Sequence, residues 1–487
     1  MILSCSCACS PAGHGGNKGA CTFPKCSSVH ASPIFNWTRS PIDTALRTHL
    51  MSSGQRSSHR TIFISEMYFY NSECGYNYPL QVLSNIGTTW NEGSMFEAEK
   101  ILWALLMIAS SVPSAIAQSA GNTPGSPGPI AVASPQDYQV FQRRTRLSGS
   151  IHVQGHTSIP VTRVEMRISG TPLSGRLSSK WQAVSFDTTS GDFAGDVSTR
   201  AGGFYRVEIR VSARGGAVCN TTIPHVGVGE VFVIAGQSNA TNYGEVLQKT
   251  QAHMVTTFDG ERWAIADDPQ PGVQDNSKKG SFIPSFGDAI FRRYHVPVGI
   301  AAVGHGSTSV RQWLPAGAKV EVMPTMTKYI VTSPDGTLIS DGTLFNGLMA
   351  RIHQLGAGGF RALLWHQGES DCHQSADHEI SAATYGRMMQ QLIHASREAA
   401  RWDFPWMVAQ ASYHTPEDIG CASILAAQHS LVEEGIALQG PDTDTLGAPY
   451  RQNQGKGTHF SDEGLKAHGL LWAERVSAYL DHALAER

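Results

Sequence analysis

Between residues 137 and 229, apolar and polar residues alternate with a period of two. The alternation is clearest in residues 150–154, 164–168 and 205–211, which are separated by turns rich in Gly or Ser. Successive side chains of a strand point to opposite faces of a sheet, so this pattern is typical of strands with one face in water. The spacing predicts a small all-β sandwich domain of antiparallel strands over 137–229.

The pattern changes after Gly229, where short apolar segments alternate with helical ones. Continuous apolar segments of this length favour parallel strands that are buried on both faces. The expected strands are residues 231–235, 299–303, 362–365, 406–409 and 436–438. The clearest helices are expected over 381–401 and 464–483. Because strands and helices alternate, the sequence predicts an α/β fold, a flavodoxin-like three-layer domain over 230–487.

The segment before this folded region differs from it in composition. Residues 1–94 hold six of the nine cysteines and show no sustained apolar period, so they are expected to be an unstructured extension or a mis-assigned start. A short apolar stretch closed by an Ala-Xaa-Ala site predicts a signal peptide over 95–117, with translation starting at Met95. Residues 118–136 have the Gly, Pro, Ser and Ala composition of a linker. We therefore expect a secreted or periplasmic protein.

The cysteines and the charge exclude several classes of function. Cys5, Cys7 and Cys9 are too closely spaced for the usual zinc ligands. A chain that begins after residue 117 keeps three cysteines, enough for one disulfide bond. The net charge is -3 and the pI is near 6.7, so no basic surface for nucleic acid is expected. The apolar stretch before residue 117 is too short to span a bilayer.

Candidate chemistry begins where the strand at 231–235 ends. Gly236 allows a sharp turn after the strand, and Ser238 follows two residues later. Open α/β sheets bind their ligands at the carboxyl ends of their strands, so Ser238 is a candidate nucleophile. The alternative is a serine that only caps the next helix.

Two further segments join this one in a specific pattern. The letters GQSN at 236–239, WHQGES at 365–370 and HF-S-x-x-G at 459–464 occur in order and at plausible separations. Together they resemble the SGNH hydrolases, in the branch of sialate O-acetylesterases and acetylxylan esterases (carbohydrate esterase family six). The resemblance covers about 230–480. A weaker match at 304–313 has Ser307 where the family usually has Gly.

The resemblance implies a serine esterase that removes O-acetyl groups from a carbohydrate through an acyl-enzyme. In that mechanism Ser238 attacks the ester carbonyl and His459 transfers the proton. The expected oxyanion donors are the backbone N–H groups of Ser238, Gly306 and Ser307 and the side-chain amide of Gln367, with the Ser238 N–H placed at the start of a helix. Neither a metal nor a cofactor is implied. Residues expected to contact the acetylated carbohydrate are Gln237 and Asn239.

The acid of the expected triad departs from the family pattern. Many members have Asp three residues before the catalytic histidine, but this chain has Lys456 there. Glu369, the acid in some acetylxylan esterases, is the first candidate, and Asp442 and Asp444 are alternatives. A Ser-His dyad without an acid also stays open.

Other interpretations are weaker or remain open. His366, Asp371, Cys372 and His373 are too close in sequence to converge on one metal ion. Two alternatives to the carbohydrate esterase remain: a general hydrolase of short-chain esters, and a catalytically silent carbohydrate-binding protein with the same fold. The sequence does not identify the acetylated glycan, because substrate specificity depends on variable loops.

Overall fold

The computed structural model describes residues 47–51, 59–68, 86–91, 129–216 and 218–485. The chain divides into two compact units, Met1–Val112 and Pro113–Arg487. The expected signal peptide over 95–117 lies outside the described residues, and so do the six cysteines of residues 1–94.

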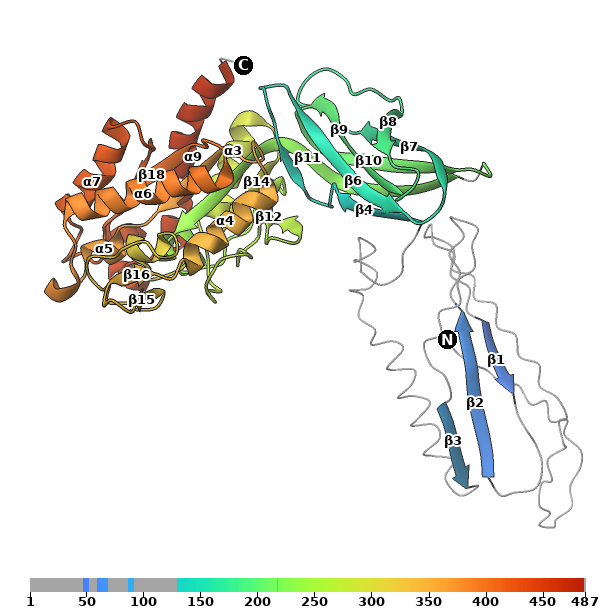
Figure 1. Cartoon of the computed structure of the whole chain (residues 1–487), viewed down its shortest axis with the longest axis horizontal. Coiled ribbons are helices and arrows are strands. Elements are labelled where there is room, and N and C mark those ends of the chain that lie inside the picture. The colour runs from blue at the N-terminus through green and yellow to red at the C-terminus, as the bar shows by residue number, and fades with distance from the viewer. Residues whose placement is uncertain (1–46, 52–58, 69–85, 92–128, 217, 486–487) are drawn as a thin grey trace, which may run out of the picture. The chain divides into compact units, whose positions relative to one another are not determined.

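The first unit contains an antiparallel sheet of three strands, in the order β1-β2-β3 (Figure 1). Its strands are β1 (Arg47–Met51), β2 (His59–Tyr68) and β3 (Ile86–Asn91). The lack of a sustained apolar period in residues 1–94 therefore did not exclude short strands in this segment.

The second unit begins with strands that pair antiparallel in the order β10-β7-β8-β9-β6-β4. They are β4 (Ile130–Ser134), β6 (Ser148–Thr157), β7 (Val161–Ser169), β8 (Gln182–Phe186), β9 (Asp192–Arg200) and β10 (Gly202–Ala213). All three segments with a period of two lie inside these strands. Strand β4 falls within the expected linker over 118–136, and four of its five residues pair with β6 despite the linker composition around them.

One long strand, β11 (Val218–Gly236), crosses the boundary at Gly229 between the segment with a period of two and the segment of alternating strands and helices. Its first half pairs antiparallel with β10, and Gly227 to Gly229 pair with the short β5 (Val140–Gln142). From Glu230 onward it pairs in parallel with β14 (Val298–Ala302) and β17 (Ala362–His366). The protein is thus a mixed α/β fold with a large central sheet.

The parallel part of that sheet has the order β12-β14-β11-β17-β18-β19. The remaining strands are β12 (Val255–Phe258), β18 (Trp406–Gln410) and β19 (Leu438–Asp442), with β13 (Trp263–Ile265) antiparallel at the edge. The strand expected at 436–438 begins at Leu438, because the N–H groups of Ile436 and Ala437 bond to Leu431 O at the end of a helix.

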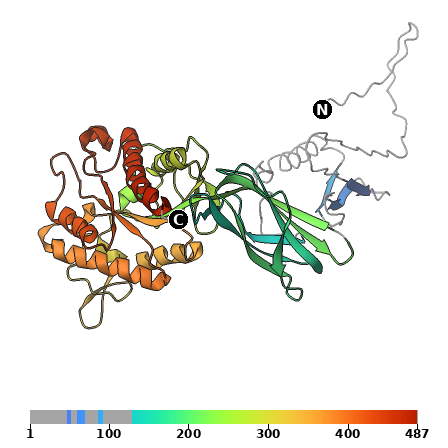
Figure 2. The same cartoon turned by 90° about the horizontal axis from the view of Figure 1, so that it is seen from above.

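Helices cover both faces of these strands (Figure 2). The main ones are α3 (Ile283–Tyr294), α4 (Thr343–Leu355), α6 (Ala382–Ala400), α7 (Ala422–Glu433) and α9 (Asp462–Ala485). In β11, Val231 and Val233 pack in one core cluster with Leu348 of α4 and Met389 of α6. The intervening Phe232 points to the other face, where its ring lies 5.3 Å from that of Phe286 in α3.

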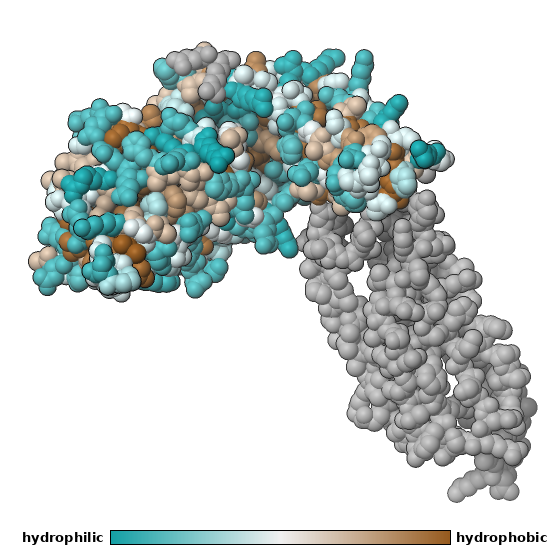
Figure 3. Space-filling model, viewed as in Figure 1, coloured by the Kyte–Doolittle hydropathy of each residue, from teal (hydrophilic) through white to brown (hydrophobic). Residues whose placement is uncertain are grey.

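In Figure 3 the visible face of the second unit is a mixture of hydrophilic residues and scattered hydrophobic ones. No helix among the described residues has the length and apolar character that crossing a membrane requires. A disulfide bond joins Cys372 to Cys421, and Cys219 is buried and free, in line with the one bond that three cysteines allow.

Candidate active site

Ser238 follows the carboxyl end of β11, where Gly236 pairs with His366 of β17. Gly236 has φ +129°, and a Cβ atom there would lie 2.0 Å from His366 O, so only glycine fits between the two strand ends. Ser238 is 5% exposed, and its Oγ has no hydrogen-bond partner among the described residues. A single 3-10 turn, Ser238–Ala240, follows it. The α-helix that we expected to direct its positive end at the site is therefore missing here.

His459 is brought to the same edge by the loop before α9. Its ring centroid lies 5.0 Å from that of Tyr243, and Phe460 O accepts a hydrogen bond from Glu245 N at 2.9 Å. These contacts join the histidine loop to the segment that follows Ser238. Among the described residues, however, no hydrogen bond links His459 to Ser238.

The His459 ring is partly buried, and this burial controls its protonation. Burial lowers the pKa of His459 to about 4, although the charge of Glu369 raises it, and the charges of Lys279 and Arg451 lower it further. The imidazole is therefore neutral at neutral pH, which is the form a general base requires. The Nδ1 atom lies 3.0 Å from Nε2 of Gln452. In this orientation the Gln452 amide donates to Nδ1; after a flip of the amide, its oxygen would instead accept the Nδ1 proton.

Glu369 begins the short helix α5 (Glu369–Cys372) and lies deep in the protein. Its Oε1 accepts hydrogen bonds from Asn239 Nδ2 at 2.9 Å and pairs with His366 Nε2 at 3.1 Å, while its Oε2 is buried without a partner. Burial alone would raise the pKa of Glu369, but the charge and hydrogen bond of His366 and the hydrogen bond of Asn239 lower it to about 2. The carboxylate influences His459 through its charge, without a hydrogen bond.

The amides of Gln367 and Gln237 connect the ends of β17 and β11. Gln367 Nε2 donates to Asp371 Oδ2 at 2.7 Å and to Thr308 O at 3.2 Å. Gln237 Oε1 accepts from Ser370 N at 3.0 Å. Both side chains are buried, and these contacts of the Gln367 amide and the Gln237 oxygen link the two loops.

The backbone N–H groups of Gly306 and Ser307, which we expected to be oxyanion donors, differ in their surroundings. Gly306 N donates to Asp275 Oδ2 at 2.6 Å and is already in use. Ser307 is exposed, has φ +60°, and makes no hydrogen bond with the described residues. A positive φ of this size favours glycine, which explains physically why the family usually has Gly at this position.

The two alternative acids lie in the loop after β19. Asp444 accepts hydrogen bonds from Ser412 N, Ser412 Oγ and Tyr413 N at 2.6 to 3.0 Å. Burial raises its pKa, against these hydrogen bonds. Asp442 Oδ1 accepts from Asp444 N at 3.1 Å. Both carboxylates cap backbone groups, and neither is bonded to His459.

Residues 228–478 match the family described as "Carbohydrate esterase, sialic acid-specific acetylesterase". The chain belongs to this family. It is a carboxylic ester hydrolase that removes O-acetyl groups from carbohydrates. No curated protein matches the chain.

Several solved structures are similar to this esterase. A carbohydrate acetylesterase from Xanthomonas citri is 17% identical, with a TM-score of 0.42, over 72% of this chain and 74% of its own. A protein from Arabidopsis thaliana is 19% identical, with a TM-score of 0.36, over 52% of this chain and 98% of its own. A carbohydrate esterase family 2 enzyme with a carbohydrate-binding domain, from Corynascus thermopiles, is 12% identical, with a TM-score of 0.29, over 72% of this chain and 99% of its own.

Arg451 is a residue of this edge that sequence reasoning did not find. The buried guanidinium lies 3.9 Å from the ring centroid of Tyr413 and 4.2 Å from that of Phe460. It donates to Leu446 O and Thr458 O, both at 2.7 Å, so it fixes the loop that carries His459. Burial lowers its pKa to about 10. A basic residue eight positions before a histidine is not part of a known sequence motif, so only the fold reveals the contact of Arg451 with the histidine loop.

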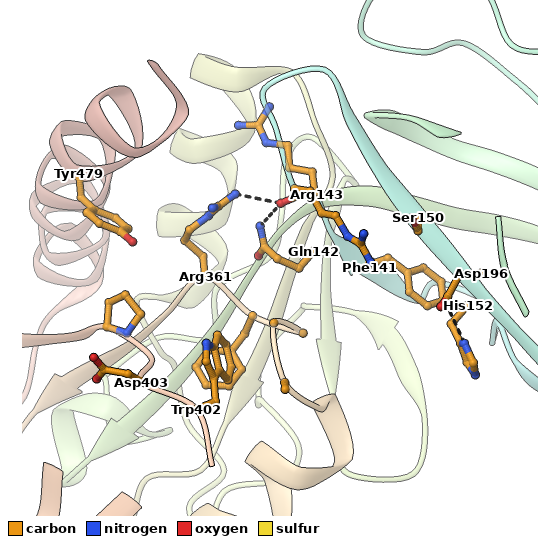
Figure 4. A pocket seen from close by; sticks show the side chains of 16 residues that line it. Phe141, Gln142, Arg143, Ser150, His152, Asp196, Arg361, Trp402, Asp403 and Tyr479 are labelled. Atoms are coloured by element: carbon orange, nitrogen blue, oxygen red, sulfur yellow. Dashed lines mark hydrogen bonds and ion pairs between the residues drawn. The ribbon is translucent and has the colours of Figure 1, made fainter. Parts of the chain in front are cut away.

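A cavity of about 420 Å³ lies at the opposite edge of the parallel sheet (Figure 4). It is lined by residues that precede β17 and β18, including Arg361 and Trp402, and by residues of β5 and β6. Arg361 Nη2 and Gln142 Nε2 both donate to Arg143 O in its wall, at 3.1 and 3.0 Å. None of the expected site residues lines this cavity, so it is separate from the candidate active site of the esterase.

Proposed function

We propose that this esterase cleaves O-acetyl esters of a carbohydrate through an acyl-enzyme on Ser238, with His459 as the general base. The observation that carries the proposal is the presence of an unbonded Ser238 Oγ and of the neutral His459 imidazole at the same edge of the sheet. The strand order supports the choice of edge. Numbered in chain order, the six parallel strands β12-β14-β11-β17-β18-β19 run 2-3-1-4-5-6, and the order reverses beside β11, where open α/β sheets bind their ligands.

In the proposed reaction, Ser238 Oγ attacks the acetyl carbonyl while His459 accepts the hydroxyl proton. The tetrahedral intermediate collapses, the sugar oxygen leaves with the proton from His459, and acetyl-Ser238 remains. Water then attacks the acetyl group with the same base, releasing acetate and restoring Ser238. We place the oxyanion donors at the N–H groups of Ser238 and Ser307, because the Gly306 N–H and the Gln367 amide are bonded elsewhere.

Among the described residues, none of the three candidate carboxylates is hydrogen-bonded to His459. The Glu369 carboxylate bonds to His366 and Asn239, and Asp442 and Asp444 cap backbone groups. We therefore propose that Gln452 orients His459 and that Glu369 contributes a negative charge at longer range. The site would then work as a Ser-His dyad. This is the alternative that stayed open because Lys456 stands where many family members have the acid.

We also propose a domain organisation, a location and a substrate partner for this esterase. The strands from β4 to β10 support a β-sandwich domain before an SGNH hydrolase domain. The proposed location is secreted or periplasmic, which suits an enzyme acting on glycans outside the cytoplasm. The proposed substrate partner is an acetylated glycan, whereas nucleic acid is not an expected partner at a net charge of -3.

The test combines substrate release with covalent labelling. Acetate release from a panel of acetylated glycans identifies the substrate, and a serine-reactive phosphonate should label Ser238 and no other serine. Activity on a chromogenic acetate without release from any glycan would favour a general short-chain ester hydrolase. Absence of both labelling and acetate release would favour a silent carbohydrate-binding protein and overturn the mechanism.

A further inference from the structure

A cluster of two histidines and one carboxylate lies beside the disulfide bond, outside the proposed mechanism. The nitrogen or oxygen ligand atoms of His373, His414 and Asp418 all lie within 4.8 Å of one another. His373 follows Cys372 directly, whereas His414 and Asp418 belong to the loop that ends at Cys421. From this arrangement we infer a binding site for one divalent cation of borderline softness, with Zn²⁺ as the expected ion.

The hydrogen bond of His373 to the backbone selects the atom that faces the cluster. Its Nε2 lies 2.6 Å from Ser412 O, and a carbonyl oxygen only accepts, so Nε2 carries a proton. A histidine that binds a metal commonly donates its other ring N–H in this way, which fixes the tautomer. The Nδ1 atom of His373 is then the one available as a ligand.

The same carboxylate oxygen faces both imidazoles. Asp418 Oδ2 lies 2.7 Å from Nδ1 of His373 and 3.4 Å from Nδ1 of His414, and the two rings stack at 4.5 Å. Three electron-rich atoms facing one another are stabilised by a cation between them. In a tetrahedral zinc site with bonds of about 2.0–2.1 Å, neighbouring ligand atoms lie roughly 3.3 Å apart. The three ligand atoms here lie within 4.8 Å of one another, so a rotation of Asp418 and of the two stacked rings would bring them to this spacing.

The loop that supplies two of the ligands is already fixed before an ion binds. Thr415 and Asp418 exchange two backbone hydrogen bonds at 3.1 Å, which form a tight turn with His414 and Asp418 at its ends. Cys421 N donates to Ser412 Oγ at 3.1 Å, and the disulfide bond ties the loop to the residue before His373. Little ordering is left for the ion to impose, and this favours binding.

The chemistry of the ligands favours zinc, and their exposure allows it to enter. Imidazole nitrogens and a carboxylate suit Zn²⁺ better than Mg²⁺ or Ca²⁺, which prefer sets made of oxygen atoms. The side chains of His414 and Asp418 are 46% and 54% exposed, and that of His373 is 12% exposed. A fourth position stays open to water. The ion would hold the loop to the end of α5, and it takes no part in the proposed acyl transfer.

The experiment is calorimetric titration of ZnCl2 into the tag-free full-length protein with its disulfide bond intact. One Zn²⁺ should bind per chain, and it should raise the melting temperature. His414→Ala and Asp418→Asn should each weaken binding at least tenfold and abolish the rise in melting temperature. The matched control is His394→Ala, which removes an exposed histidine of α6 and should bind as the parent does.

Two outcomes would overturn the site. One is the absence of saturable binding by the parent, which would leave the cluster as a contact between His373 and Asp418 without a metal. The other is equal binding by the parent, His414→Ala and Asp418→Asn, which would assign the zinc to other histidines among the 20 in the chain. Melting of each variant without metal shows that it is folded, and Asp418→Asn decides the result if His414→Ala does not fold.

Discussion

Nε2 of His366 lies 3.1 Å from Oε1 of Glu369, and Nδ1 of the same ring lies 3.1 Å from Nε2 of His468. Trp472 Nε1 donates to Nε2 of His468, so that nitrogen is an acceptor and His366 donates to it. The Glu369 carboxylate pairs with the other nitrogen of the same ring, so His366 links Glu369 to the histidine of α9. The charge of Glu369 is thus balanced mainly by His366, away from His459.

This ion pair predicts a double effect of Glu369→Gln. Removing one partner of a buried ion pair commonly costs about 3–5 kcal/mol, because the other charge is left uncompensated. We expect the variant to melt at a clearly lower temperature and also to turn over more slowly, since His459 loses the long-range effect of the Glu369 charge. Thermal unfolding and kcat for a chromogenic acetate measure the two effects. A variant with parental melting would show that His366 is neutral.

The same pair predicts how stability depends on pH. The pKa of Glu369 is about 2 in the folded protein, below its ordinary value of 4.5, so its contribution is present above about pH 4.5 and is lost as the pH falls toward 2. Unfolding by denaturant should therefore show a decrease in stability over that range that is smaller in Glu369→Gln. Equal slopes in the two proteins would contradict the lowered pKa.

For the proposed nucleophile, Ser238→Ala should abolish acetate release with little change in melting. A buried hydroxyl without a partner is exchanged for a methyl group, and the apolar strand behind it is unchanged. Acetate assays and thermal unfolding test this expectation, and Ser309→Ala, which removes a buried hydroxyl bonded to Asp371, is the contrasting variant that should lose stability. Release within twofold of the parent would exclude Ser238 as the nucleophile.

The acid limb of the pH profile should report His459. Because burial lowers its pKa from 6.5 to about 4, kcat/KM should stay high at pH 5 to 6 and fall by half near pH 4. Initial rates on a chromogenic acetate, with recovery checked at pH 7, separate titration from unfolding. A midpoint near pH 6.5 would mean that the base is exposed or is another group.

Gly236→Ala should be strongly destabilising. The added Cβ would meet His366 O at 2.0 Å, and φ +129° disfavours any residue except glycine. The matched control is Gly215→Ala, because nothing lies within 4 Å of a Cβ at that position. Thermal unfolding should show a large loss for the first variant and almost none for the second.

The sequence predicted the parts of the fold that depend on local patterns. The helices α6 and α9 lie within two residues of their expected bounds, because a long apolar period of one face specifies a helix. Ser238 and Glu369 were expected at one edge because the carboxyl ends of parallel strands meet there. The contact of His366 with His468 spans 102 residues and depends on how α9 packs, so no local pattern reveals it.

The continuity of β11 has a consequence for any attempt to divide the protein. A cut between Gly229 and Glu230, where the two sequence patterns meet, would pass through the middle of a strand. It would also separate Glu230 from Arg143, whose Nε lies 2.7 Å from Glu230 Oε1 in a fully buried ion pair. Each fragment would keep only half of β11, so we expect the antiparallel strands from β4 to β10 and the parallel sheet to fold only when they are expressed as one piece.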